Sequence, residues 1–471
     1  MIKPRIWQAE CVNLAVSHYQ ACANHFLVLA TPGAGKTFMA SNLAAHLLNA
    51  DKIDFVFCFS PSSIVAQDFC EELQDKTNER MDGRLGSKGH SLTYQSMQYL
   101  DDAFWSLFDK FRILVIFDEI HHCSGSNVEN ANSWGEQIIL NIQDNATFTL
   151  ALTGTPWRSD TTPIVLSKYA ESTNKIICDY VYGLSEAIRD KVCRFPQIIA
   201  VDNDNISLTE QNETKQFNSF GELFSQSAFP YQNIIEDEKV ILHFLEQANQ
   251  KLTELICFNP DAGGLIVASS VEHAQQISAL LHNVINENAV IVTYREDEPS
   301  QLIKQFREGD DKWIISVGMI SEGTNIPRLQ VCCHLTNIKT EMHFRQILGR
   351  ILRRTTSINQ EAFFYMPAEP KLVEYAYRVG DDIPSEADIV TFEKMNGNGV
   401  DKGSSLELGI QNHPYEDKEH KIEMDLPEEF FECSERHQFD AGFSVGNYEK
   451  MLDIFGRFKQ ETLAHSLMPL E

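Results

Sequence analysis

The stretch RILVIFDEIHH, residues 112–122, decides the fold of this chain. Its first part, Arg112–Phe117, is a nearly continuous apolar run, which predicts a strand buried on both faces of a parallel sheet. Such sheets bind ligands at the carboxyl ends of their strands, where Asp118 and Glu119 follow. Two carboxylates at that edge can take separate roles. Asp118 can hold Mg²⁺ through a water molecule, and Glu119 can polarise the attacking water. An isolated acidic pair is most often an ordinary loop, so this interpretation depends on the other motifs.

A glycine-rich loop, ATPGAGKT at Ala30–Thr37, lies about 80 residues before the acidic pair and follows a short apolar stretch, His25–Ala30. The chain then continues with helical periodicity, so backbone N–H groups and the positive end of a helix can bind phosphate. Lys36 would reach the β and γ phosphates, and Thr37 would ligate Mg²⁺ together with Asp118. ATP and Mg²⁺ are therefore the expected cofactors. The loop residues expected to bind ATP are Gly33, Ala34, Gly35, Lys36 and Thr37.

Three later segments follow the order found in superfamily 2 helicases and translocases, and the chain resembles that family over about residues 5–354. The segments are LTGTPWR at Leu152–Arg158, similar to motif III; SEGTNIP at Ser321–Pro327, similar to motif V; and QILGRILR at Gln346–Arg353, similar to motif VI. The phosphate loop also has the form AxxGxGKT seen in this family, because Ala30 replaces the usual first glycine. The acidic pair has the DExH form, which DNA translocases and RNA helicases share.

The resemblance implies a catalytic centre between two RecA-like domains. The arginines Arg350 and Arg353 of motif VI would reach the γ-phosphate across the cleft between them. Since these arginines are three residues apart, one helical face could direct both at a single anion. The catalytic residues implied in this way are Lys36, Asp118, Glu119, Arg350 and Arg353.

Weaker family positions extend this assignment. Gln8 resembles the glutamine that reads adenine, and Gly323 and Asn325 of motif V would contact the nucleotide. Asn325 stands where aspartate is common, so its ribose contact would carry no charge. The residues expected to couple ATP to nucleic acid are His121, Thr153, Thr155 and Gln346. The hydroxyl residues expected on the nucleic-acid backbone are Ser62, Thr93, Ser96, Ser269 and Ser270, each of which taken singly is more often a helix cap or turn residue.

Composition adds constraints on the compartment and the partner. The chain has 471 residues, 43% of them hydrophobic, and eleven cysteines without a spacing pattern, which predicts reduced thiols and a cytoplasmic location. The start lacks the apolar core of a signal peptide, and no run reaches the length of a membrane span, so no membrane partner is expected. The net charge of −28 argues against tight, unaided binding of nucleic acid, although much of the acidic excess lies beyond about Lys371.

The apolar runs predict an α/β protein, and the resemblance implies two RecA-like, doubly wound parallel-sheet domains in tandem with a C-terminal extension. The expected domains are a helicase ATP-binding domain at residues 1–182, a linker or helical insertion at 183–257, a helicase C-terminal domain at 258–370 and an acidic extension at 371–471. Within the second domain the runs GLIVAS, AVIVTY, WIISVG, VCCHL and AFFYM are the expected strands.

The expected function is an ATP hydrolase that moves on or unwinds nucleic acid, with DNA favoured over RNA. The motif set resembles the helicase subunits of restriction enzymes and bacterial phage-defence systems. An alternative is an ATP switch that closes on a duplex or on a protein partner without unwinding, with the acidic extension as the docking element. A nuclease-helicase would need a metal site near Glu416 and Lys418, which is a weak candidate. A P-loop kinase or transporter ATPase would leave the region Gly264–Arg353 unexplained.

The phosphate loop generates the first prediction. Lys36→Ala should abolish ATP hydrolysis and leave the fold intact, because the change removes a phosphate-binding charge from a surface loop without emptying a core. Steady-state ATPase assays and circular dichroism measure the two effects. Turnover equal to that of the parent would show that the loop does not bind the reacting phosphates.

Overall fold

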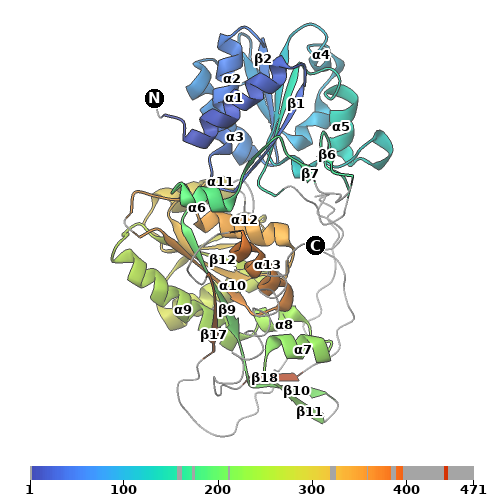
Figure 1. Ribbon diagram of the computed structural model, residues 1–471. Coiled ribbons are helices and arrows are strands. Elements are labelled where there is room, and N and C mark those ends of the chain that lie inside the picture. The colour runs from blue at the N-terminus through green and yellow to red at the C-terminus, as the bar shows by residue number, and fades with distance from the viewer. Residues whose placement is uncertain are drawn as a thin grey trace, which may run out of the picture. The chain divides into compact units, whose positions relative to one another are not determined.

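The computed structural model describes residues 3–155, 162–171, 176–210, 213–296, 298–318, 325–357, 359–382, 389–395 and 440–443. The chain forms two compact units. The larger unit comprises Met1–Ala200 and Ile234–Thr391, and the smaller comprises Val201–Asn233 and Phe392–Glu471. The larger unit contains a six-stranded sheet and most of a seven-stranded sheet (Figure 1).

The six-stranded sheet is parallel throughout, with strand order β3-β2-β4-β5-β1-β8. Its strands are β1 (His25–Ala30), β2 (Phe55–Ser60), β3 (Gly89–Thr93), β4 (Ile113–Phe117), β5 (Phe148–Thr153) and β8 (Tyr180–Tyr182). Every residue of β4 is buried, as its apolar run predicts. The strand expected at Arg112–Phe117 is therefore confirmed as β4, and the apolar stretch His25–Ala30 is the strand β1, whereas β3 and β8 at the two edges were not predicted.

Helices cover both faces of this sheet. The helices of this part of the chain are α1 (Ile6–Gln20), α2 (Lys36–Asn49), α3 (Ser63–Thr77), α4 (Asp102–Trp105) and α5 (Ser133–Asn141), with 3-10 turns η1 (Tyr94–Tyr99), η2 (Ile120–His122) and η3 (Val128–Asn130), and the helix α6 (Leu184–Arg189) follows β8. Figure 1 shows α2 and α3 on one side and α5 on the other. On the α5 side, Ile138 and Ile142 pack in a buried cluster with Phe59, Val115 and Phe117. A two-stranded antiparallel ribbon, β6 (Lys168–Tyr169) with β7 (Ile176–Ile177), lies outside the sheet.

The seven-stranded sheet has the order β13-β14-β12-β15-β16-β9-β17. Its strands are β9 (Phe195–Asp202), β12 (Gly263–Ala268), β13 (Ala289–Val292), β14 (Trp313–Ser316), β15 (Leu329–Leu335), β16 (Glu361–Pro367) and β17 (Val390–Lys394). Its helices are α9 (Glu238–Ile256), α10 (Val271–Leu280), α11 (Pro299–Glu308), α12 (Glu341–Ile351) and α13 (Pro370–Asp381), with a π-helical turn η4 (Leu281–Ile285). The five apolar runs expected as strands are β12 to β16, and they pair in parallel. The expected α/β fold class is confirmed.

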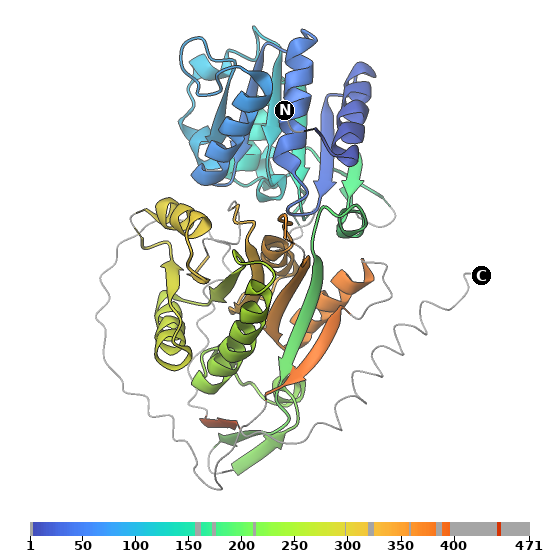
Figure 2. The same cartoon turned by 90° about the vertical axis from the view of Figure 1, so that its left-hand side faces the viewer.

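The segment 183–257, expected to be a linker or helical insertion, is partly built into the second sheet. Its strand β9 lies between β16 and β17 (Figure 2), a pairing that joins residues far apart in sequence. Its last element is the helix α9, which begins where Asp237 caps the N–H groups of Lys239 and Val240. The domain boundaries expected from the sequence stay predictions.

The smaller unit contains an antiparallel hairpin, β10 (Ile206–Glu210) with β11 (Glu213–Phe217), and the helix α7 (Phe220–Gln226). The strand β18 (Asp440–Phe443) pairs antiparallel with β10. The helix α8 (Tyr231–Ile235) crosses the boundary between the units. Most of the acidic extension, including Glu416 and Lys418, lies outside the described residues. No helix in the described part is long and apolar enough to cross a membrane.

The close packing of β12 against β14 predicts the effect of one methyl group. Gly264→Ala should lower the free energy of unfolding by about 1–3 kcal/mol, because a Cβ there would lie 2.2 Å from the completely buried ring of Trp313. Gly380→Ala in α13 is the control, since its Cβ would meet nothing within 4 Å and alanine favours the helix. Urea unfolding measures both. Equal stability of Gly264→Ala and the parent would contradict the packing described for β12.

Candidate active site

The loop between β1 and α2 is shaped by two glycines in the left-handed backbone region. Gly33 has φ 81° and Gly35 has φ 92°, values that side chains rarely tolerate. A Cβ at Gly35 would lie 2.7 Å from the Gln8 amide nitrogen, so α1 also packs closely here. Lys36 begins α2 directly after this turn. The loop therefore has the strand–turn–helix context that phosphate binding requires.

Helix α1 holds the loop through its first turn. The Gln8 amide nitrogen donates to the carbonyl of Gly35 at 3.0 Å, and its amide oxygen accepts from the Arg5 N–H at 2.8 Å. The Arg5 guanidinium donates to the carbonyl of Ala34 at 2.6 Å. Gln8 thus supports the loop backbone, and its expected contact with adenine stays a prediction. The contact of Arg5 with the loop was not predicted from the sequence. Its position three residues before Gln8 was the feature that could have indicated it.

The acidic pair follows β4 and meets the phosphate-loop lysine. The Lys36 ammonium lies 3.1 Å from one Glu119 carboxylate oxygen, and the Gly154 N–H donates to the other at 3.0 Å. Glu119 has the left-handed conformation φ 50°, ψ 55°, which is uncommon for a residue with a side chain. Lys36, Glu119 and Gly154 come from the loops after β1, β4 and β5, which adjoin in the sheet. The predicted convergence of the loop and the acidic pair is therefore present in the structure.

The two carboxyls differ in charge balance. Burial would raise the pKa of Glu119, but Lys36, His121 and the Gly154 N–H outweigh it, so the pKa is lowered. Burial and the charge of Glu119 instead raise the pKa of Asp118 to about 7. Asp118 is 7% exposed, and its Oδ1 has no hydrogen-bond partner among the described residues. Glu119 is therefore paired directly with Lys36, whereas for Asp118 the charge of Lys36 offsets burial only in part.

The donor set fits a hard cation such as Mg²⁺. Hard cations take carboxylate and hydroxyl oxygens, and Asp118 offers an unpartnered oxygen in a site where a positive charge would offset its burial. Thr37 lies in the first turn of α2, directly after Lys36. Among the described residues no group of three or more histidine, cysteine and acidic side chains forms a separate metal site.

The loop after β5 is linked to the acidic pair by side-chain hydrogen bonds. The His121 Nδ1 lies 3.0 Å from the Thr153 hydroxyl, which also donates to the carbonyl of Thr155 and accepts from its N–H. His121, Thr153 and Thr155 are all buried. The structure thus brings together three of the four residues expected to couple ATP to nucleic acid. The fourth, Gln346, lies on α12, and Pro156, Trp157 and Arg158 are outside the described residues.

The predicted helical face for the two arginines is wrong. Helix α12 ends at Ile351, so Arg350 lies in its last turn and Arg353 lies beyond it. The buried Arg194, which was not predicted, ends the helix: its guanidinium donates to the carbonyl of Ile351 at 3.1 Å and its N–H to that of Leu352 at 2.7 Å. No local sequence pattern marks Arg194, because its partners lie about 160 residues away.

Beyond the helix, Arg353 has its own restraints within the larger unit. Its guanidinium donates to the Asn325 amide oxygen, and its Cγ lies 3.1 Å from the place a Cβ on Gly33 would occupy. Burial and the charge of Arg350 lower the pKa of Arg353, but an arginine stays protonated at neutral pH. A bound anion would offset this cost. Asn325 thus contacts an arginine, and its expected contact with the ribose stays a prediction. Gly323 lies outside the described residues.

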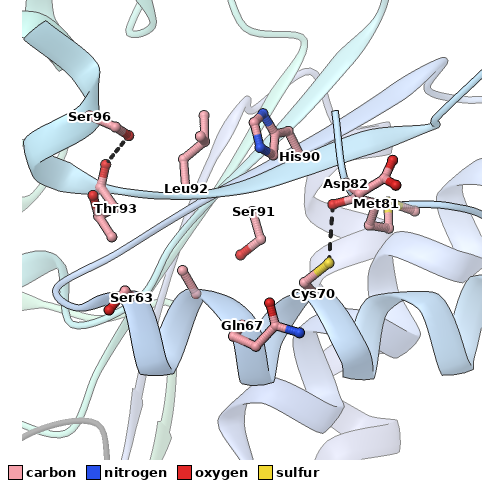
Figure 3. Close-up of a pocket in the computed structure, with 11 residues that line it drawn as sticks. Ser63, Gln67, Cys70, Met81, Asp82, His90, Ser91, Leu92, Thr93 and Ser96 are labelled. Carbon is pink, nitrogen blue, oxygen red and sulfur yellow. Dashed lines mark hydrogen bonds between the residues drawn. The ribbon is translucent and has the colours of Figure 1, made fainter. Parts of the chain in front are cut away.

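Most hydroxyls expected on nucleic acid have local partners. Ser62 caps α3 through the N–H of Val65, and Ser270 caps α10 through the N–H of His273. The Ser269 hydroxyl lies 2.8 Å from the His273 ring. The Ser96 hydroxyl donates to the carbonyl of Thr93 at 2.6 Å, and both residues line a shallow pocket between α3 and β3 (Figure 3). Their contacts with nucleic acid stay predictions.

The fold and this site define a helicase-type chain built on two RecA-like domains. Residues 1–158 match the model of the type III restriction enzyme res subunit, and residues 247–355 match that of the helicase conserved C-terminal domain. The chain is therefore similar to superfamily 2 helicases and, among them, to subunits of restriction enzymes.

Individual relatives agree with this family. An uncharacterised protein of Mycobacterium tuberculosis is 30% identical over 79% of this chain, which spans 62% of that relative's length. The DNA 3'-5' translocase XPB2 of Sulfurisphaera tokodaii is 23% identical, covering 75% of this chain and 79% of the relative. A solved fragment of a putative HsdR subunit of a type I restriction enzyme from Vibrio vulnificus has the same fold, with a TM-score of 0.58, 17% identity, and coverage of 83% of this chain and 69% of that chain.

The Lys36–Glu119 pair generates a prediction that separates binding from hydrolysis. Glu119→Gln should lose ATP hydrolysis, because the amide keeps the shape of the side chain but cannot act as a base. ATP should bind at least as tightly as in the parent, since Lys36 no longer has an ion pair to give up. Titration calorimetry and phosphate release measure the two quantities. Loss of ATP binding would show that Glu119 has a structural role.

Proposed function

We propose that this chain is an ATP-driven nucleic-acid translocase or helicase that acts on DNA rather than RNA. The observation that carries the proposal is the charge arrangement at the edge of the first sheet: a lysine and a glutamate paired at 3.1 Å beside a buried aspartate oxygen without a partner. This arrangement suits a nucleotide phosphate with a divalent cation. The relation to restriction subunits and to a DNA translocase supports DNA as the substrate and a restriction or phage-defence role.

In the proposed mechanism the ammonium of Lys36 leaves Glu119 for the β and γ phosphates, which the backbone of Gly33, Ala34 and Gly35 surrounds. Glu119, released from the ion pair, orients the attacking water and accepts its proton. Asp118 and Thr37 would hold Mg²⁺, which supplies positive charge beside the phosphates when bound. Gln8 would contact adenine.

The second sheet contributes the arginines. Arg350 and Arg353 would meet the charge that develops on the γ-phosphate, and the contact of Arg353 with Asn325 holds a protonated guanidinium ready without neutralising it. His121, Thr153 and Thr155 would relay the state of the γ-phosphate to the nucleic-acid groove. Closure of the two RecA-like domains on ATP and reopening after hydrolysis would move the chain along its substrate.

Further parts of the proposal concern location and partners. The eleven cysteines without a spacing pattern support a cytoplasmic location. The acidic segment 371–471 would dock a protein partner, because its charge repels nucleic acid. The domain division proposed for the chain is the one expected from the sequence, with β9 assigned to the second sheet.

The arginine beyond α12 tests this function. Arg353→Ala should bind ATP nearly as well as the parent and hydrolyse it roughly a thousandfold more slowly, the effect of removing an arginine finger. Single-turnover hydrolysis and nucleotide affinity are the measurements, each with and without nucleic acid.

The neighbouring arginine supplies a matched control. The Arg354 guanidinium donates to the Lys191 carbonyl and the Gln360 side chain, so Arg354→Ala removes the same charge from a structural position. It should hydrolyse ATP at close to the parent rate. Normal hydrolysis by Arg353→Ala, or an equal loss in both variants, would refute the assignment of Arg353.

A further inference from the structure

The short helix η1, Tyr94–Tyr99, is fixed to the catalytic edge by its first residue. Tyr94 is completely buried, and its hydroxyl donates to the main-chain carbonyl of Asp118 at 2.8 Å. Its ring stacks on that of Trp134 from α5, with 5.5 Å between ring centres and 19° between ring planes. The polar end and the apolar face of Tyr94 are therefore both held in place.

The carbonyl that Tyr94 binds belongs to the peptide between Asp118 and Glu119. The Asp118 N–H donates to the carbonyl of Phe59 at 2.9 Å, so hydrogen bonds hold the residue on both sides. Glu119 follows with φ 50°, a conformation that costs free energy unless its surroundings impose it. A rotation of this peptide would turn the Glu119 side chain relative to Lys36. The Tyr94 hydroxyl consequently helps to set the direction of Glu119.

The other face of η1 is open to solvent. Gln95, Gln98 and Tyr99 are exposed, and Tyr99 keeps 80% of its accessible surface. Thr93 and Ser96, the hydroxyl residues expected on a phosphodiester backbone, stand at the start of the helix and are joined by a hydrogen bond (Figure 3). One six-residue element thus presents polar groups outward and contacts the catalytic peptide inward.

We propose that Tyr94 is a positioning residue that transmits binding of a nucleic-acid backbone on η1 to Glu119. A ligand on the outer face shifts or steadies η1, and the Tyr94 hydroxyl carries that change to the Asp118–Glu119 peptide. This link from η1 to Glu119 lies at the edge of the first sheet. It would act in parallel with the hydrogen bond between His121 and Thr153. The inference rests on the proposed function, since it presumes an ATPase that nucleic acid stimulates.

The test removes a single oxygen atom. Tyr94→Phe keeps the ring on Trp134 and deletes the hydrogen bond to Asp118. We expect the ratio of stimulated to unstimulated ATPase rates to fall roughly tenfold, the change that corresponds to losing one ordinary hydrogen bond. The KM for ATP and the affinity for a labelled oligonucleotide should stay within about twofold of the parent, because the binding groups are intact.

A second tyrosine, which packs against the same sheet from α1, provides the control. The buried Tyr19 hydroxyl donates to the carbonyl of Thr149 at 2.9 Å, at the amino end of β5 and away from the catalytic edge. Tyr19→Phe should therefore lose comparable stability and keep full stimulation. Trp134→Leu leaves the Tyr94 hydroxyl but removes the ring on which Tyr94 stacks, so it should give an intermediate loss of stimulation. It replaces Tyr94→Phe as the test if that variant does not fold.

The outcomes separate this inference from the proposed function. Selective loss of stimulation in Tyr94→Phe supports it. Full stimulation of Tyr94→Phe, or an equal loss in Tyr19→Phe, overturns the role of Tyr94 and leaves the proposed function standing. If single-stranded DNA, duplex DNA and RNA all fail to stimulate the parent, both the proposed function and this inference are overturned.

Discussion

The parallel pairing of β1, β5 and β4 is the constraint on which the site depends. In a parallel sheet every strand brings its carboxyl end to the same edge, so residues distant in sequence meet there. The register places Leu29 beside Thr153 and Phe117 beside Ala151. The loops that follow then place Lys36, Glu119 and Gly154 within hydrogen-bonding distance. A shift in this register would separate these groups without disturbing the composition of the core.

Charge is the second constraint, because the edge holds two carboxylates and one nearby lysine. The lysine pairs with Glu119, and the pKa of Asp118 rises to about 7 as a result of burial and the neighbouring charge. Carboxyls whose pKa is perturbed by burial and a neighbouring charge cluster at functional sites. Arg353 presents the opposite case, a cation whose pKa is lowered because burial and the charge of Arg350 outweigh the charge of Asp68. Both sites would be relieved by the ligand that the proposal assigns to them, a nucleotide with its cation.

The sequence predicted the parts of the site whose partners are local. The Gly33–Thr37 loop and the acidic pair are each marked by a short sequence pattern after an apolar strand. In the structure both follow the carboxyl end of such a strand. The five central strands of the second sheet were visible as apolar runs for the same reason. These features follow from strand burial and turn chemistry, which act over a few residues.

Long-range contacts set the features that the sequence did not reveal. Strand β9 was predicted to be part of a linker or insertion. Its partners in the sheet, β16 and β17, come far later in the chain, so no local pattern indicates the pairing. Arg194 ends α12 through carbonyls about 160 residues away, so a helix extended over both motif VI arginines was the wrong expectation. Tyr94 lies between Thr93 and Ser96, two residues expected on the nucleic-acid backbone, and its hydrogen bond to Asp118 joins residues 24 apart in the chain. In each case the tertiary partner, and not the local pattern, assigns the role.

The central claim is that ATP hydrolysis at the first sheet responds to nucleic acid. The most direct measurement is the ATPase rate of the full chain, titrated in parallel with single-stranded DNA, duplex DNA and RNA at fixed salt. We predict saturable stimulation, stronger with DNA than with RNA. A rate that stays the same with all three would contradict it.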